Sequence, residues 1–171
     1  MKKVITLAAV ALALAVSGLQ ASDKTAGEVV DDSWLHTKVK TAMIGHGSSG
    51  VNVEVYHGVV QLAGFLSGEG NKENLLNAVN GVEGVKKVSD QLHVVKGDRS
   101  AGTVVDDNTI TAQVKARLVD AGMGSINVEV NSKHVLLSGF VDSDDVRDKA
   151  IQTAKGVEGV EKVINGMDLK S

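Results

Sequence analysis

Apolar side chains recur at helical spacing at two places in the chain. The two sets are Leu35, Val39 and Met43, with Ala42 beside them, and Ile110, Val114 and Leu118. Positions four residues apart lie on one face of a helix, so each set predicts an amphipathic helix with one buried stripe. Short polar side chains stand before both stripes, as Asp31-Asp32-Ser33 and Asp106-Asp107-Asn108. These residue types predict helix N-caps at the two positions.

Short β-branched runs follow each of these helices. Residues 51–55 and 59–65 are separated by Tyr56-His57-Gly58, which predicts a β-hairpin, and the second turn is Asn131-Ser132-Lys133. A second helix is expected at 69–80 and again at 144–155. Gly81 and Gly156 come directly after these segments, where a left-handed residue commonly ends a helix. The runs 85–95 and 160–169 predict a third strand in each copy.

The chain contains the same unit twice, at an offset of 75 residues. Residues 29–96 align with residues 104–171 without a gap and share 22 identities in 68 positions. Asn-Val-Glu-Val, for example, occurs at 52–55 and at 127–130. We therefore expect an α+β fold with two tandem αββαβ domains, each with two helices packed on one face of a three-stranded sheet. The domains are expected at 29–96 and 104–171, joined by a flexible linker at 97–103.

The N-terminus has the pattern of a secretory signal peptide. Lys2 and Lys3 precede an apolar run at 4–16, and a small-residue site ends at Ala21. We expect cleavage after Ala21, a short segment at 22–28 before the first domain, and a periplasmic protein. Loss of the two lysines leaves 16 basic against 21 acidic residues, a net charge of −5. This charge argues against nucleic acid as a partner, because nucleic-acid binding relies on basic side chains that neutralise phosphates.

Composition removes further classes of chemistry. The chain has no cysteine, which excludes disulfides, a thiol nucleophile, a zinc–thiolate site and a lipidated cysteine anchor. None of the five histidines recurs at the offset of 75, and none has metal-ligand spacing; they are His36, His46, His57, His93 and His134. No Gly-x-Ser-x-Gly pattern for a hydrolase and no phosphate-binding glycine loop is present. We expect no catalytic set, no cofactor and no small-molecule substrate.

One acidic cluster resembles the start of a calcium loop. The spacing of Asp142, Asp144, Asp145 and Asp148 begins like that of an EF-hand loop, but Val146 stands where the third oxygen ligand is needed. Carboxylates are also favoured at the start of a helix by the backbone dipole. We therefore expect a helix N-terminus here and no metal site.

The motifs quoted above resemble those of the BON-domain family. The resemblance rests on Asp-Asp at the first helix, Asn-Val-Glu-Val, Gly-Phe at the end of the hairpin, and Gly-Val-x-Gly-Val before the last strand. Family glycine positions are matched by Gly64 and Gly84 and by Gly139 and Gly159. A signal peptide with two such domains is similar to the osmotically inducible periplasmic members. The resemblance implies a small α+β sandwich and a non-enzymatic role, either chaperone-like protection in osmotic stress or phospholipid binding at the cell envelope.

Trp34 distinguishes the first copy from the second. On a helix it lies beside the apolar stripe and in line with Lys38, whereas the second copy has Thr109 and Gln113 at these positions. A tryptophan beside a lysine suits a lipid headgroup region or a partner protein. Alternatively, Trp34 packs against the linker or the other copy. The hypotheses that follow are a stress-associated protein that binds unfolded or outer-envelope proteins, and a peripheral phospholipid binder.

Overall fold

The computed structural model describes residues 26–97 and 100–170, and the expected signal peptide lies outside them. Ten elements follow the order αββαβ twice. They are α1 (Ala26–Ala42), β1 (Val51–Tyr56), β2 (Val59–Ser67), α2 (Glu69–Asn80), β3 (Lys87–Val95), α3 (Ala101–Asp120), β4 (Asn127–Asn131), β5 (His134–Val141), α4 (Asp144–Lys155) and β6 (Lys162–Leu169). Within the described residues, no helix is both long and apolar enough to cross a membrane.

Each copy forms a three-stranded sheet covered by two helices. The strand orders are β1-β2-β3 and β4-β5-β6, with an antiparallel hairpin and a parallel third strand in each sheet. Each sheet has its own core against its helices. Leu35, Val39 and Met43 lie in one core, and Ile110, Val114 and Leu118 lie in the other. The α+β architecture and the two buried stripes are therefore confirmed.

The second helix of each copy agrees with the sequence pattern, whereas the third strands begin two residues later than expected, at Lys87 and Lys162, and the first helices begin earlier. Helices α2 and α4 begin and end at the expected residues. Helix α1 already begins at Ala26 and α3 at Ala101, so residues 101–103 of the expected linker are helical. Ser100 caps α3, since its side chain accepts a hydrogen bond from the Thr103 amide. The domain boundaries drawn from the repeat remain a prediction.

The two Asp-Asp motifs do not cap helices, which corrects the prediction. Asp107 lies inside α3, is 2% exposed, and accepts hydrogen bonds from the amides of Ser132 and Lys133 at 2.8 and 2.9 Å. Asp32 does the same in α1, with the amides of His57 and Gly58 at 2.9 and 3.0 Å. Each carboxylate therefore holds the hairpin turn of its own sheet against the first helix, because tight turns leave amides that need acceptors.

The helix C-caps also differ from the prediction. Gly81 and Gly156 both have φ of −79° and are right-handed, so neither is the expected left-handed cap. The left-handed glycines come three residues later, Gly84 with φ of 100° and Gly159 with φ of 86°. A Cβ at Gly159 would lie 3.2 Å from Cδ1 of Ile110. The second glycine of Gly-Val-x-Gly-Val thus turns the chain toward the third strand while it lies close to the first helix.

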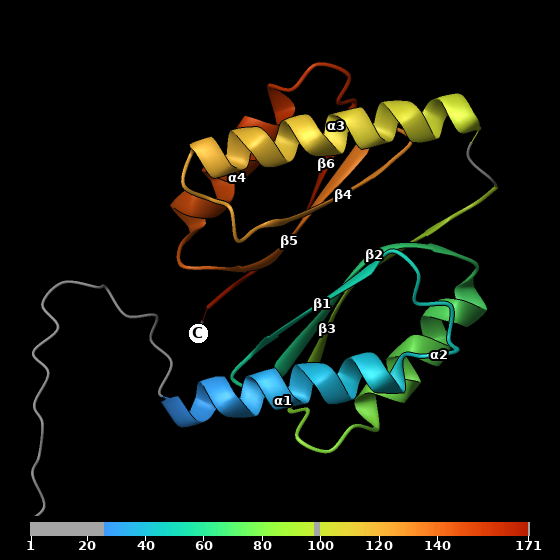
Figure 1. Ribbon diagram of the computed structural model, residues 1–171, viewed down its shortest axis with the longest axis vertical. Coiled ribbons are helices and arrows are strands. Elements are labelled where there is room, and N and C mark those ends of the chain that lie inside the picture. The colour runs from blue at the N-terminus through green and yellow to red at the C-terminus, as the bar shows by residue number, and fades with distance from the viewer. Residues whose placement is uncertain (1–25, 98–99, 171) are drawn as a thin grey trace, which may run out of the picture.

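The two sheets face each other, and the helices lie on the outside (Figure 1). In this view α1 and α3 run in opposite directions along the two outer edges of the molecule. Ala63 and Leu136 are almost fully buried although neither belongs to the core of its own domain. The face of each sheet that turns away from its helices is therefore covered by the other domain.

Polar side chains connect the two sheets in a reciprocal pattern. The Asn52 amide donates to Glu129 Oε1 at 3.0 Å, and the Asn127 amide donates to Glu54 Oε1 at 2.9 Å. Because Asn52 and Glu54 correspond to Asn127 and Glu129 at the offset of 75, each repeated motif bonds the other copy. The repeated Asn-Val-Glu-Val thus serves the contact between the domains as well as the strand that contains it.

A second group of contacts between the domains has no such symmetry. Gln61 is 1% exposed; its amide nitrogen donates to Asp168 at 2.6 Å, and its oxygen accepts from the Gly139 amide at 2.6 Å. The hydroxyl of Ser89 donates to the same Asp168 oxygen at 2.5 Å. The positions equivalent to Gln61 and Ser89 in the second domain are Leu136 and Ile164, which cannot make these bonds.

Candidate functional site

Trp34 lies on the outer face of α1 and is 57% exposed. Lys38, one turn later, places its Nζ 3.6 Å from the centroid of the indole ring. The same nitrogen is 3.4 Å from Glu83, in the segment between α2 and β3. The expected juxtaposition of Trp34 with Lys38 is thus present, while the alternative that Trp34 packs against the linker or the other copy does not fit its exposure. The indole is held in place by a cation–π contact on the surface.

Two hollows meet at Trp34, and we call them together the Trp34 groove. The first has a volume of about 280 Å³ and is bordered by Trp34, Asp31, Leu35, His57, Gly84 and Lys86. The second has a volume of about 390 Å³ and is bordered by Trp34, Thr37, Lys38, Thr41, Val82 and Glu83. Helix α1 forms one wall, and the segment from Val82 to Lys86 forms the other. An indole between two hollows offers an apolar surface flanked by charges of both signs.

The second domain has a hollow at the equivalent place but different side chains in it. This hollow has a volume of about 300 Å³, and Thr109, Gln113, Lys133 and Glu158 lie on its border. Thr109 and Gln113 stand where the first domain has Trp34 and Lys38. The groove is therefore a feature of the domain fold, and the aromatic surface is specific to the first copy. Sequence reasoning identified the indole but not the second wall, because the chain pattern does not show that residues 82–86 pack beside α1.

The structural glycines differ in how strictly their positions require glycine. A Cβ at Gly64 would overlap the backbone oxygen of Gly50, so no side chain fits there. Gly139, its counterpart, has φ of 120°, and its Cβ position lies 3.5 Å from the Ser125 oxygen. These glycines let the chain before β1 or β4 pass close to the central strand. They support the sheet, and neither borders the Trp34 groove.

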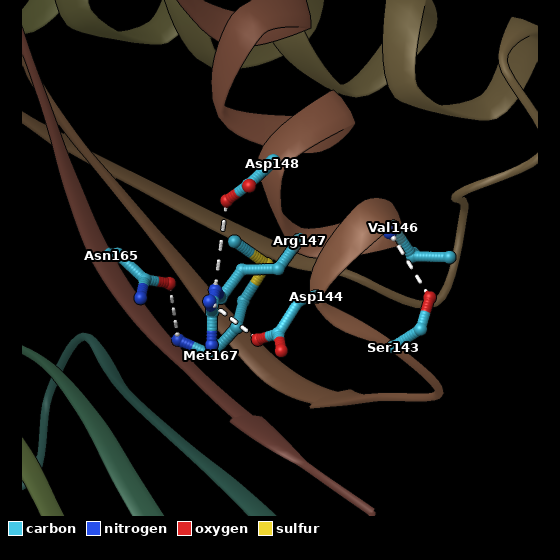
Figure 2. Close-up of polar contacts among 7 residues, drawn as sticks. All are labelled: Ser143, Asp144, Val146, Arg147, Asp148, Asn165 and Met167. Carbon is cyan, nitrogen blue, oxygen red and sulfur yellow. Dashed lines mark hydrogen bonds and ion pairs between the residues drawn. The ribbon is translucent and has the colours of Figure 1, made fainter.

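The acidic cluster lies at the N-terminus of α4, and its side chains form ion pairs (Figure 2). Arg147 lies 2.5 Å from Asp144 and 3.9 Å from Asp148, and Ser143 caps the helix by accepting from the Val146 amide at 3.3 Å. Lys170 pairs with Asp142 at 2.5 Å. Over residues 26–97 and 100–170, no group of three or more histidine or acidic side chains is arranged to hold a metal ion.

The histidines are dispersed over the fold. His36 contacts the Val53 carbonyl oxygen at 3.1 Å, and His57 lies in the first hairpin turn. His93 packs against Phe65 on β2, with ring centroids 6.0 Å apart. Its Nε2 atom is buried and has no hydrogen-bond partner in the described part of the chain. Burial, together with repulsion from Lys72 and Lys162, lowers the pKa of His93 below 6.5, although Asp90 opposes the shift.

This lowered pKa predicts a loss of stability in mild acid. The unfolded chain binds the proton at the ordinary pKa of about 6.5, while the folded chain resists it. The contribution of neutral His93 is therefore complete above pH 6.5 and falls as the pH drops toward the lower pKa of the folded state. We expect the melting temperature of the parent protein to fall more steeply between pH 7.5 and 5.5 than that of His93→Gln. Equal slopes in the two thermal melting series would contradict this assignment.

Comparison with known proteins agrees with the repeated fold. The sequence model of the BON domain matches residues 31–96 and 106–171. Osmotically-inducible protein Y of Escherichia coli is 36% identical over 153 residues, which cover 84% of this chain and 75% of that protein. Outer membrane lipoprotein DolP of Haemophilus influenzae is 32% identical over 158 residues, 88% of this chain and 81% of that protein.

One solved structure shows only a distant likeness. CdsD, a structural protein of the type III secretion system of Chlamydia trachomatis, is 14% identical, with a TM-score of 0.35, over 81% of this chain and 63% of that one. This value is too low to support any argument. The family match covers both copies of the repeat, and two relatives above 30% identity extend across both. The chain therefore belongs to the BON-domain family and contains two copies of the domain.

Proposed function

We propose that this protein is a non-enzymatic, stress-associated protein of the bacterial periplasm that binds partner polypeptides in the Trp34 groove. The observation that carries the proposal is Trp34 itself, which is 57% exposed and borders two hollows. Tryptophan is enriched among the residues that contribute most of the binding energy at protein contacts. The periplasmic role is supported by the expected signal peptide and by similarity to an osmotically-inducible protein and an outer membrane lipoprotein.

The chemistry of the groove suits an extended polypeptide segment. An apolar side chain of the partner would rest against the indole face, and the charges of Asp31, Lys86 and Glu83 border the space for its backbone and polar groups. Tryptophan contributes strongly at such contacts because a rigid ring buries a large area at small entropic cost.

A phospholipid surface is the second candidate, and the Trp34–Lys38 pair is the observation that favours it. Indole rings settle at the headgroup level, and a lysine attracts anionic lipid. Two features weaken this candidate. Lys38 is already paired with Glu83, and the expected mature charge of −5 opposes an anionic surface. The polypeptide proposal therefore accounts for more of the site.

Trp34→Ala should separate the two functions. Loss of a central tryptophan typically costs 2 kcal/mol or more in binding, so we expect roughly a 30-fold loss in affinity for a fluorescent unfolded polypeptide. The melting temperature should stay nearly unchanged, because Trp34 lies outside both cores. Thr109→Ala, at the equivalent position of the second domain, is the matched control and should bind normally.

The same variants are then tested with anionic phospholipid vesicles. The polypeptide proposal expects no sedimentation with vesicles at about 0.15 M salt and suppression of client aggregation without lipid. Sedimentation that depends on Trp34, with no effect of Trp34→Ala on polypeptide binding, would replace it with the phospholipid function. Polypeptide binding that survives Trp34→Ala unchanged would remove the Trp34 groove as the site.

A further inference from the structure

The core of neither domain depends on the contact between the two domains. Each domain has a complete core of its own, and no core residue of one domain belongs to the core of the other. The contact between them combines hydrogen bonds through Asn52, Glu129, Gln61 and Asp168 with apolar contact, since the rings of Tyr56 and Phe140 lie with centroids 5.4 Å apart across it. The hydrogen-bonding groups tolerate water when the domains separate, and interfaces within a chain commonly open unless they are large and hydrophobic.

The contact also specifies which domains pair. If two first domains met through this face, His93 would stand where Asp168 now accepts from Gln61 and Ser89. If two second domains met, Leu136 and Ile164 would replace Gln61 and Ser89 opposite a carboxylate, leaving Asp168 without these donors. Only a first domain with a second domain satisfies every bond. The crossed Asn–Glu bonds would form in any combination, so the specificity comes from the asymmetric group.

We propose that the chain forms a domain-exchanged dimer in which the first domain of each copy pairs with the second domain of the other. The partner is thus an identical chain, and the surface is the sheet face that carries Asn52, Gln61, Ser89, Asn127 and Asp168. Only a short stretch of chain joins the two domains, since β3 ends at Val95 and α3 begins at Ala101. Exchange needs no new contact, because each interface of the dimer repeats the one within the monomer.

The absence of cysteine makes this proposal directly testable by cross-linking. Ser89 Oγ lies 2.5 Å from Asp168 Oδ2 across the contact, so cysteines placed there are near each other only when a first domain meets a second. Two full-length variants are prepared, one with Ser89→Cys and one with Asp168→Cys. They are unfolded in denaturant, mixed, refolded together and oxidised. Exchange predicts a covalent dimer that contains one chain of each variant.

The yield should follow protein concentration. A short linker gives an effective concentration within the chain in the millimolar range, so about half of the chains should exchange near 1 mM and only a few per cent near 20 μM. Refolding Ser89→Cys alone should give at least tenfold less covalent dimer, because two first domains do not pair. Asp142→Cys, at an exposed aspartate outside the contact, is the matched control for Asp168→Cys.

Two results would overturn the proposal. One is a single monomeric species at every concentration in size-exclusion chromatography of the unmodified chain refolded in the same way. The other is a dimer in which Ser89→Cys links as readily to itself or to Asp142→Cys as to Asp168→Cys. A second pair, Gln91→Cys with Gly166→Cys, repeats the test at another place on the contact, where the Cβ of Gln91 lies 3.2 Å from the Cβ position of Gly166. Because that position also lies 3.0 Å from Cδ1 of Leu136, each variant must first give a cooperative melting curve.

Discussion

Gly64→Ala is expected to lower the free energy of unfolding of the first domain by at least about 3 kcal/mol. The added Cβ would overlap the backbone oxygen of Gly50, and the chain before β1 would have to move away from the central strand β2. Overpacking against backbone typically costs 1–3 kcal/mol or more, because no side chain can rotate away. Chemical denaturation followed by circular dichroism measures the loss.

Gly70→Ala is the matched control. Gly70 lies in the first turn of α2, and nothing is within 4 Å of its Cβ position. Alanine favours the helix over glycine, so this variant should be neutral or gain up to about 1 kcal/mol. Similar stabilities for the Gly64 and Gly70 variants would show that the close approach of Gly50 to β2 is not rigid.

The second large effect is expected for Asp107→Ala, at about 3 kcal/mol. The substitution removes the carboxylate that accepts hydrogen bonds from the amides of Ser132 and Lys133. Both amides are partly buried, so the loss of this acceptor is costly. Ser132 and Lys133 are left-handed, with φ of 49° and 65°, a conformation that costs energy in residues other than glycine. The carboxylate therefore stabilises a turn that its own residues disfavour.

Two further variants test this account. Asp107→Asn keeps one acceptor oxygen and should lose roughly half as much stability as Asp107→Ala. Asp106→Ala changes the exposed neighbour and should stay within about 0.5 kcal/mol of the parent. If Asp106→Ala and Asp107→Ala unfold at the same urea concentration, the bonds to the turn are not what stabilises the hairpin.

Regular periodicity made most of the fold predictable, and the errors lie where tertiary contacts determine a residue's role. The burial of Leu35, Val39 and Met43 can be predicted from their spacing, because residues four apart lie on the same face of a helix. The sequence predicts caps at Asp32 and Asp107, because a short acidic side chain before an apolar stripe is typical of a helix N-terminus. Their actual partners lie 25 and 26 residues further on, in a turn that no local pattern connects to the helix.

The same limit applies to the candidate site and to the contact between the domains. Trp34 and Lys38 share one helix, so their proximity follows from sequence spacing. The wall formed by residues 82–86 does not, because it depends on how the loop packs beside α1. Similarly, Gln61 and Asp168 each stand between apolar residues of their strands, which is the pattern of a side chain that faces solvent. A polar residue on the outward face of a strand does not reveal that a second sheet covers it.

The crossed Asn–Glu bonds have a consequence for how the two copies can diverge. Each copy forms part of the environment of the other, so a change at Asn52 alters the surroundings of Glu129 as directly as it alters its own strand. The outer faces carry no such mutual constraint, and there one copy has Trp34 where the other has Thr109. Duplication thus keeps the crossed Asn–Glu pairs alike in the two copies, while one copy is free to acquire a specialised outer surface without disturbing its neighbour.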